Sequence, residues 1–305
     1  MNILITGGAG YIGTSLIPLL LQDGHRVTVL DNLLHGAEAM LPFFRSERFS
    51  FIKGDTRNLK AMREAINGNE AIVHLAAIVG MHACNINQQD TISTNVEGSR
   101  NILTLVDDQR VIYTSTVSTY GKFEGGVCNE EAPLRPLSLY GETKAEAEKL
   151  LLEHPGTTAL RLSTLFGLSP RMRLDLLVND FTYQSVFNKS MVVYQSEVIR
   201  AMVHILDAVD SIRMALVRPD MQGKIYNVVG CNPLKREICE VIQKETGAYF
   251  HYAEVGEDGD GRNAAVNGNK LAIAGWKPRR TLVSGVHEMA RAFSAFKIRN
   301  PYANT

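Results

Sequence analysis

The sequence has little that would direct the protein to a membrane or a nucleic acid. Among its 305 residues, Lys plus Arg and Asp plus Glu number 32 each, so the formal net charge is zero and no overall field attracts nucleic acid or anionic lipid. Long hydrophobic runs are missing too: the apolar stretch 1–5 runs into glycines and is too short for a signal sequence or a membrane span. We therefore expect a cytoplasmic protein with no membrane and no nucleic-acid partner.

Cysteine is also scarce. Cys84, Cys128, Cys231 and Cys239 lie far apart and form no Cys-x-x-Cys pair, which fits neither a disulfide framework nor a zinc site. We interpret them as reduced thiols that pack in the interior and expect no metal site.

Short apolar runs alternate with helical patterns through the first half of the chain. The expected strands are 2–6, 26–30, 49–53, 71–75 and 111–114, and the expected helices are 11–22, 59–66, 91–106 and 139–152. The strands are nearly continuous in hydrophobic residues, as strands covered on both faces are. This alternation predicts an α/β fold of the Rossmann type, with a doubly wound parallel sheet whose ligands bind at the carboxyl ends of the strands.

The alternation becomes irregular beyond about residue 166. A strand-like segment at 224–230 suggests that the chain returns to the first sheet. We therefore expect a first domain of residues 1–165 plus a returning segment at about 198–230. A smaller, discontinuous lobe of residues 166–197 and 231–305 would bind the substrate.

Three glycines follow the first expected strand at a Gly-x-x-Gly-x-x-Gly spacing. Gly7, Gly10 and Gly13 would let the backbone turn tightly, admit a pyrophosphate to the amides and pack the helix on the strand. The alternative is an ordinary strand-to-helix turn. Asp31, at the end of the next strand, takes the position that hydrogen-bonds an adenosine ribose, so the full context favours a dinucleotide.

Two carboxylates refine this site. Asp31 would repel a ribose 2′-phosphate, and no Arg or Lys occurs in 32–44 to neutralise one, so NAD is favoured over NADP. Asp55 is placed to hold the adenine amino group, and an equally weighted alternative makes it the N-cap of the helix that follows.

A phenol and an ammonium occur four residues apart, hence on one face of a helix, at Tyr140 and Lys144. A free tyrosine titrates near 10, and a neighbouring lysine ammonium and an oxidised nicotinamide both stabilise its phenolate. The strand end 113–116 brings hydroxyl groups to the same edge of the sheet. The pair can therefore act as a proton relay.

Together these motifs resemble an extended short-chain dehydrogenase/reductase of the NAD-dependent epimerase/dehydratase family, which modifies nucleotide-activated sugars. The similarity covers nearly the whole length, and the motifs that carry it fall in the family's order at 6–13, 30–32, 54–55, 74–77, 95–98, 113–121 and 136–144. The resemblance implies that Tyr140 transfers the proton, that Lys144 holds the nicotinamide ribose, and that Thr116 hydrogen-bonds the reacting sugar oxygen. His74 is interpreted as a packed strand residue.

The site residues follow from the motifs and the resemblance. Those expected to bind NAD are Gly7, Gly10, Tyr11, Ile12, Gly13, Asp31, Asn32, Asp55, Thr56, Leu75, Ala76, Ala77, Asn95, Tyr140 and Lys144. Those expected to bind a nucleotide-diphosphate sugar are Thr116, Asn179, Tyr194, Arg200 and Arg262. Arg200 matches the family arginine that contacts the diphosphate, a task that suits a permanently charged guanidinium.

Departures from the family pattern narrow the chemistry. Val117 and Ser118 stand where the 4,6-dehydratase branch has an Asp-Glu pair, which disfavours dehydration. Thr164 and Ala201 replace a common Asn and Asp, so the sugar site is not a standard UDP-glucose pocket. The tract 169–183 is similar to a branch that includes C4 dehydrogenases of GDP-heptoses.

We therefore expect an NAD-dependent 4-dehydrogenase or 4-epimerase of a nucleotide-linked sugar. The alternatives are a 4-keto-sugar reductase and a non-catalytic NAD-sensing protein on the same fold. Relatives pair through the two helices here placed at 91–106 and 139–152, so the resemblance also implies a homodimer. Ile102, Leu105, Leu150 and Leu151 are its candidate contact residues, unless they face the sheet.

Overall fold

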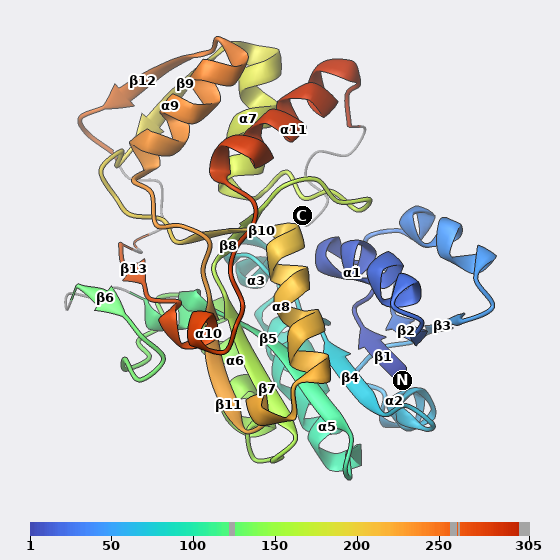
Figure 1. Cartoon of the computed structure of the whole chain (residues 1–305). Helices are drawn as coiled ribbons and strands as arrows, with labels where there is room; N and C mark the ends of the chain where they lie inside the picture. The colour runs from blue at the N-terminus through green and yellow to red at the C-terminus, as the bar shows by residue number, and fades with distance from the viewer. Residues whose placement is uncertain (122–125, 257–260, 262, 299–305) are drawn as a thin grey trace.

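A seven-stranded parallel sheet forms the centre of the molecule (Figure 1). The computed structural model describes residues 1–121, 126–256, 261 and 263–298. The strand order is β11-β7-β5-β4-β1-β2-β3, and every neighbouring pair is parallel. In chain order the strands are β1 (Asn2–Thr6), β2 (Arg26–Asp31), β3 (Phe49–Lys53), β4 (Ala71–His74), β5 (Arg110–Thr116), β7 (Thr157–Leu162) and β11 (Lys224–Val228). The predicted Rossmann-type fold is confirmed.

Helices cover both faces of the sheet, because side chains of a strand alternate between its faces. Ile3 and Ile5 of β1 pack with α1 (Tyr11–Gln22) and α8 (Ile205–Val217). Leu4, between them, packs on the opposite face with α2 (Leu59–Ile66), α5 (Gly98–Leu105) and α6 (Leu139–Leu151). Ile102 and Leu151 are fully buried in this second layer, so two of the four candidate dimer contacts face the sheet instead.

The helix expected at 91–106 is interrupted. Its structure is α4 (Gln88–Ile92), a π-helical turn over Ser93–Glu97 and then α5. The turn aims the Asn95 side chain at the loop after β4, where its Oδ1 accepts from Ile78 N at 2.8 Å and its Nδ2 donates to Ile78 O at 3.0 Å. Asn95 also donates to Thr143 Oγ1 at 3.0 Å and so ties α6 to that loop.

A smaller lobe stands over the carboxyl ends of the strands (Figure 1). It contains α7 (Leu177–Asn188), β9 (Ser190–Tyr194), α9 (Lys235–Thr246), β12 (Tyr249–Ala253) and α11 (Leu282–Ala295), with a hydrophobic core of its own. β9 and β12 form a parallel pair. The segment around α10 (Asn269–Ile273) differs from the expected division, because α10 lies against β11, and Leu271 and Trp276 pack into the core of the large sheet rather than into the smaller lobe.

Shorter elements connect these layers. They are η1 (Glu38–Arg45), α3 (Met81–Ile86), η3 (Val117–Tyr120), β6 (Val127–Cys128), β8 (Thr164–Phe166), β10 (Met202–His204), η4 (Pro219–Met221) and β13 (Ala265–Val266). β8 pairs with β10, and β6 with β13. In the described part of the chain, no helix has both the length and the apolar character needed to cross a membrane, and no cluster of metal-binding side chains occurs. All four cysteines are free thiols.

Candidate active site

The glycine turn after β1 requires its glycines. Gly7 has a φ of +70°, and a Cβ on it would lie 2.6 Å from Ala76 N at the end of β4. A Cβ on Gly13 would collide with the backbone of Gly8. Gly10 is the N-cap of α1, so the backbone amides at the start of this helix face the carboxyl edge of the sheet.

A cavity of about 230 Å³ lies beside this turn, and it fits the adenosine and pyrophosphate side of NAD. The predicted residues that line it are Gly7, Gly10, Tyr11, Ile12, Gly13, Asp31, Asn32, Asp55, Thr56, Leu75, Ala76 and Ala77. Asn95 is not among them; its side chain is buried and holds Ile78, which does line the cavity.

Asp31 is fixed by backbone amides. Its Oδ2 accepts from Ala9 N at 3.0 Å and its Oδ1 from Leu33 N at 2.8 Å. Burial raises the pKa of this carboxyl group, and the two amide hydrogen bonds and the charge of Arg171 oppose that shift. Arg171, itself 8% exposed, lines the same cavity. Arg171 comes from the loop after β8, far in sequence from residues 32–44, in which no Arg or Lys occurs.

Asp55 is held in the cavity wall by Arg57. The guanidinium donates from Nε and Nη2 to the carboxylate at 3.0 and 2.8 Å and lowers the pKa of Asp55 to about 2. The N-cap alternative is wrong: the residue that caps α2 is Asn58, whose side chain accepts from Lys60 N and Ala61 N. The charged Asp55 therefore faces the cavity that fits adenosine.

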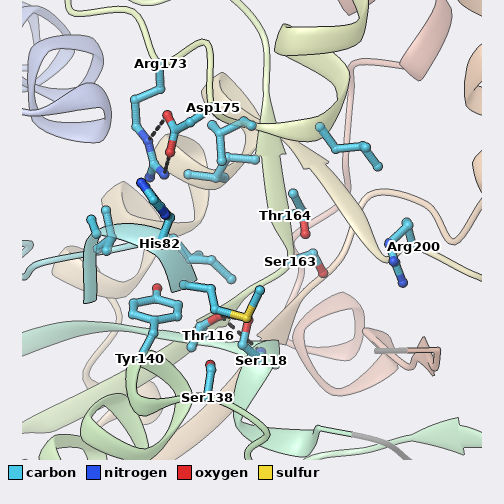
Figure 2. A pocket seen from close by; sticks show the side chains of 18 of the residues that line it. His82, Thr116, Ser118, Ser138, Tyr140, Ser163, Thr164, Arg173, Asp175 and Arg200 are labelled. Carbon is cyan, nitrogen blue, oxygen red and sulfur yellow. Dashed lines mark hydrogen bonds and ion pairs between the residues drawn. The ribbon is translucent and has the colours of Figure 1, made fainter. Parts of the chain in front are cut away.

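A second, larger cavity of about 580 Å³ continues from the first. Thr116, Tyr140 and Lys144 line one side of it, and Tyr194 and Arg200 line it too. Figure 2 shows Arg200 across the cavity from Tyr140, with Ser163 and Thr164 between them. The two cavities meet at the residues that line both, which are Ile12, Leu75, Ala77, Val79, Leu165 and Arg173.

Lys144 is brought beneath the cavity by α6, which begins after its N-cap Ser138. Its Nζ lies 4.1 Å from the centroid of the Tyr113 ring, and the residue is 3% exposed. Burial lowers the pKa of Lys144 to about 7, and the Glu148 carboxylate opposes that shift. The ammonium therefore titrates close to neutral pH, which makes it responsive to a ligand or a phenolate nearby. His74 is buried between Thr6 and Ser99, as a packed strand residue.

Hydroxyl groups cover the floor of the larger cavity. Thr116 Oγ1 donates to Ser118 Oγ at 3.1 Å and accepts from Ser118 N at 3.1 Å. Ser115 Oγ and Ser163 Oγ are buried and make no hydrogen bond to any described residue. Because buried hydroxyls usually find partners, these two fit a ligand that supplies polar groups.

An ion pair that no sequence pattern predicted lies at the junction of the two cavities. Arg173 donates from Nε and Nη2 to the Asp175 carboxylate at 3.0 and 2.5 Å, and Figure 2 places the pair above Tyr140, beside His82. The charges of Arg171 and Arg173 together help hold the pKa of Asp175 below its usual range. The arginine-rich tract 169–173 signalled this segment, but nothing local indicated where it folds.

Two residues predicted to bind the substrate, Asn179 and Arg262, are not seen to line the cavity. Asn179 is fully buried: its Oδ1 accepts from Gly167 N at 3.0 Å, and its Nδ2 donates to Arg173 O at 2.8 Å and Tyr11 Oη at 3.2 Å. Its side chain therefore braces the loop and does not line the cavity. Arg262 lies outside the described residues.

The fold and the cavity beside the glycine turn are those of a dinucleotide-binding protein, and sequence comparison identifies the family. The chain belongs to the NAD-dependent epimerase/dehydratase family, whose profile matches residues 3–229. The predicted family and the predicted cofactor, NAD, are thereby confirmed.

The relatives include proteins named as epimerases and proteins named as dehydratases. The chain is 31% identical over 279 residues to a protein of Bacillus subtilis named as an uncharacterized UDP-glucose epimerase, covering 83% of this chain and 85% of the relative. It is 26% identical over 309 residues to a dTDP-glucose 4,6-dehydratase of Streptomyces niveus, covering 94% and 91%.

Solved structures share the fold over almost the whole chain. The dTDP-glucose 4,6-dehydratase DesIV of Streptomyces venezuelae, with NAD and TYD bound, has a TM-score of 0.85 at 25% identity and covers 95% of this chain and 96% of its own. The UDP-glucose 4-epimerase of Thermus thermophilus, in complex with NAD, has a TM-score of 0.84 at 23% identity and covers 96% and 99%.

Proposed function

We propose that the protein oxidises C4 of a nucleotide-diphosphate sugar, as a 4-dehydrogenase or a 4-epimerase. The observation that supports this most directly is one cavity lined by Thr116, Tyr140 and Lys144 on one side and by the buried cation Arg200 on another. A sugar would bind at the hydroxyl groups and its diphosphate at the arginine. Structural neighbours that bind nucleotide sugars support the same class of substrate.

Each residue of the triad has a role in this proposal. The chemistry that NAD would supply here is a hydride acceptor for the carbon that bears the reacting hydroxyl group. Tyr140 takes the proton of that hydroxyl, and Thr116 hydrogen-bonds its oxygen. Lys144 holds the nicotinamide ribose, and its charge stabilises the Tyr140 phenolate.

The end of β5 argues against dehydration. Val117 packs into a small core with Tyr120 and Cys128, and Ser118 Oγ hydrogen-bonds Thr116. Neither position offers a carboxylate beside the reacting sugar. Two carboxylates elsewhere do line the cavity, but Asp175 is ion-paired with Arg173 and Asp180 accepts a hydrogen bond from Gln184. We therefore favour oxidation at C4 without loss of water, although some relatives are named 4,6-dehydratases.

The fate of the hydride separates the remaining activities. The enzyme is incubated with a panel of UDP-, GDP-, CDP- and dTDP-sugars, while absorbance of the reduced nicotinamide is followed and products are identified by mass. A product lighter by two hydrogen atoms, with lasting NADH, identifies a dehydrogenase. We expect this result, because tract 169–183 resembles the dehydrogenase branch of the family. A product of unchanged mass without lasting NADH identifies an epimerase.

The same assay detects the competing functions. A product lighter by one water would contradict the argument from Val117 and Ser118. Turnover of 4-keto sugars with NADH alone would identify a reductase. Binding of NAD without turnover of any sugar nucleotide would favour a non-catalytic NAD-sensing protein.

A further inference from the structure

A buried lysine lies at the substrate end of the larger cavity. Lys235 is the first residue of α9, is 1% exposed and lines the cavity together with Arg200, which is 4% exposed. Its Nζ donates to Tyr194 O at 2.7 Å, at the end of β9. Lys235 thus lies with Tyr194 and Arg200, two residues that we already expect to bind the nucleotide sugar.

The backbone brings the two cations together from distant parts of the chain. Ile199 and Leu234 form an isolated antiparallel bridge. On either side of it, Arg200 N donates to Pro233 O at 2.8 Å and Lys235 N donates to Val198 O at 2.9 Å. Side chains alternate along paired segments, so Arg200 and Lys235 project from the same side of this ribbon. That side is the one facing the cavity, since both residues line it.

A cation at the first position of α9 does not stabilise that helix, because the helix dipole is positive at its N-terminus. Arg236, the next residue, projects to the surface and not into the cavity. Its side chain is 46% exposed and lies 3.4 Å from Glu197 and 4.0 Å from Glu240.

We infer that Lys235 and Arg200 together bind the diphosphate of the nucleotide sugar, with Lys235 as the second cation that makes the site prefer a diphosphate to a monophosphate. The arginine fork suits two oxygens of one phosphate group, and the lysine ammonium acts as a compact charge for the other. The helix N-terminus adds partial positive charge at the same point. This inference rests on the proposed function, since it assigns part of the same substrate site.

The test compares two neighbouring cations of α9 in NAD-loaded protein. Lys235→Met removes the charge in the cavity, and the matched control Arg236→Met removes one on the surface. Affinities for UDP, GDP, dTDP and the corresponding monophosphates are measured by calorimetry. We expect Lys235→Met to weaken the best diphosphate by about tenfold or more, the size expected for a charge-assisted hydrogen bond. Monophosphate binding, NAD binding and the Arg236→Met variant should change by less than about threefold.

Two further measurements keep the outcome unambiguous. Lys235→Arg keeps the charge and should retain diphosphate binding within several-fold. In wild-type protein with 15N-labelled lysine, the Lys235 signal, identified by its loss in Lys235→Arg, should shift when the diphosphate is added. This experiment decides the matter if Lys235→Met does not fold.

The failures of the two proposals are distinguishable. If the wild-type protein binds no nucleoside diphosphate, the proposed function fails. If it binds one, but Lys235→Met binds it equally well or the Lys235 signal does not move, the role of Lys235 is overturned and the proposed function stands.

Discussion

Burial changes what individual side chains of the site can do. Lys144, fully enclosed beside Tyr113, has its pKa lowered to about 7, whereas Asp55, tied to Arg57, has its pKa lowered to about 2. The first group therefore titrates in the range in which enzymes work, and the second stays charged throughout it. A lysine poised in this way can respond to a developing phenolate on Tyr140, which lines the same cavity.

Replacing Tyr140 by Phe should separate chemistry from binding. The variant loses only the hydroxyl that transfers the proton, so we expect turnover to fall by about 10²- to 10⁴-fold. NAD affinity and thermal stability should stay close to wild type. The measurements are kcat on the identified sugar nucleotide, NAD titration and a melting curve. Tyr249→Phe, at a position 62% exposed on β12, is the control, and near-normal turnover of Tyr140→Phe would remove that residue from the mechanism.

Asp31 should set the preference for NAD over NADP. We predict that its carboxylate meets the ribose where NADP carries the 2′-phosphate, so we expect the wild-type protein to bind NAD at least about tenfold more tightly than NADP. Asp31→Asn should reduce the preference for NAD over NADP, because Arg171 lines the same cavity and its charge could then attract the 2′-phosphate of NADP. Adding Arg171→Ala should increase the preference for NAD again. Titration of both cofactors tests this prediction. Equal affinity of the wild-type protein for NAD and NADP would refute the carboxylate argument.

At the scale of elements, the site depends on close approach of backbone segments. The π-helical turn at Ser93–Glu97 places Asn95 against Ile78, so that the loop after β4 is held beside the cofactor cavity. The turn between β1 and α1 approaches the end of β4 so closely that no side chain fits at Gly7. These contacts fix the edge of the sheet on which both cavities are built.

Gly13→Ala tests the packing of α1. The added Cβ would meet the Gly8 backbone, which cannot move without disturbing the turn. We expect a loss of about 1 to 3 kcal/mol in the free energy of unfolding, as for overpacked sites, together with weaker NAD binding. Denaturant titration and NAD titration measure the two effects. Gly268→Ala is the control, because its Cβ would approach no atom closer than 3.4 Å, and it should change neither the free energy of unfolding nor NAD affinity by much. Equal effects of the two variants would show that the turn at Gly13 tolerates a Cβ.

At the scale of the whole molecule, the substrate cavity forms where the smaller lobe covers the sheet. Tyr140 and Lys144 come from α6, Arg173 from the loop before α7, and Arg200 and Lys235 from segments on either side of α8 and β11. The cavity therefore exists only when both lobes are folded. Figure 1 shows α7, α9 and α11 gathered above the carboxyl ends of the strands, where these segments meet.

We predict that the protein is a homodimer through α5 and α6. These helices pack against each other, and Leu105 and Leu150 on them are only half-buried, unlike Ile102 and Leu151. Light scattering at micromolar concentration should give about twice the 33.7 kDa of one chain. The double variant Leu105→Glu and Leu150→Glu should be monomeric. The control Val283→Glu, at an exposed position of α11, should remain a dimer. A monomeric wild-type protein would reject the prediction.

The amino-acid sequence by itself determined the strands and helices around the cofactor turn. The bounds of β1, α1, β3 and α2 match the expected ones, because hydrophobic runs, glycine spacing and helical periodicity are local signals. For the same reason the residues between Gly7 and Ala77 that we predict to bind the cofactor line one cavity. Each lies at the end of a strand or in the turn after it, and parallel strands bring those ends to one edge.

Only the tertiary structure decided which other residues reach the site. Arg171, Arg173, Asp175 and Lys235 line the cavities although each lies in a polar stretch typical of a surface. Asn179, in the same tract, turns inward to brace Gly167 instead. Whether a polar side chain faces solvent, core or cavity depends on how distant segments pack against it, and a local pattern in the sequence does not contain that information.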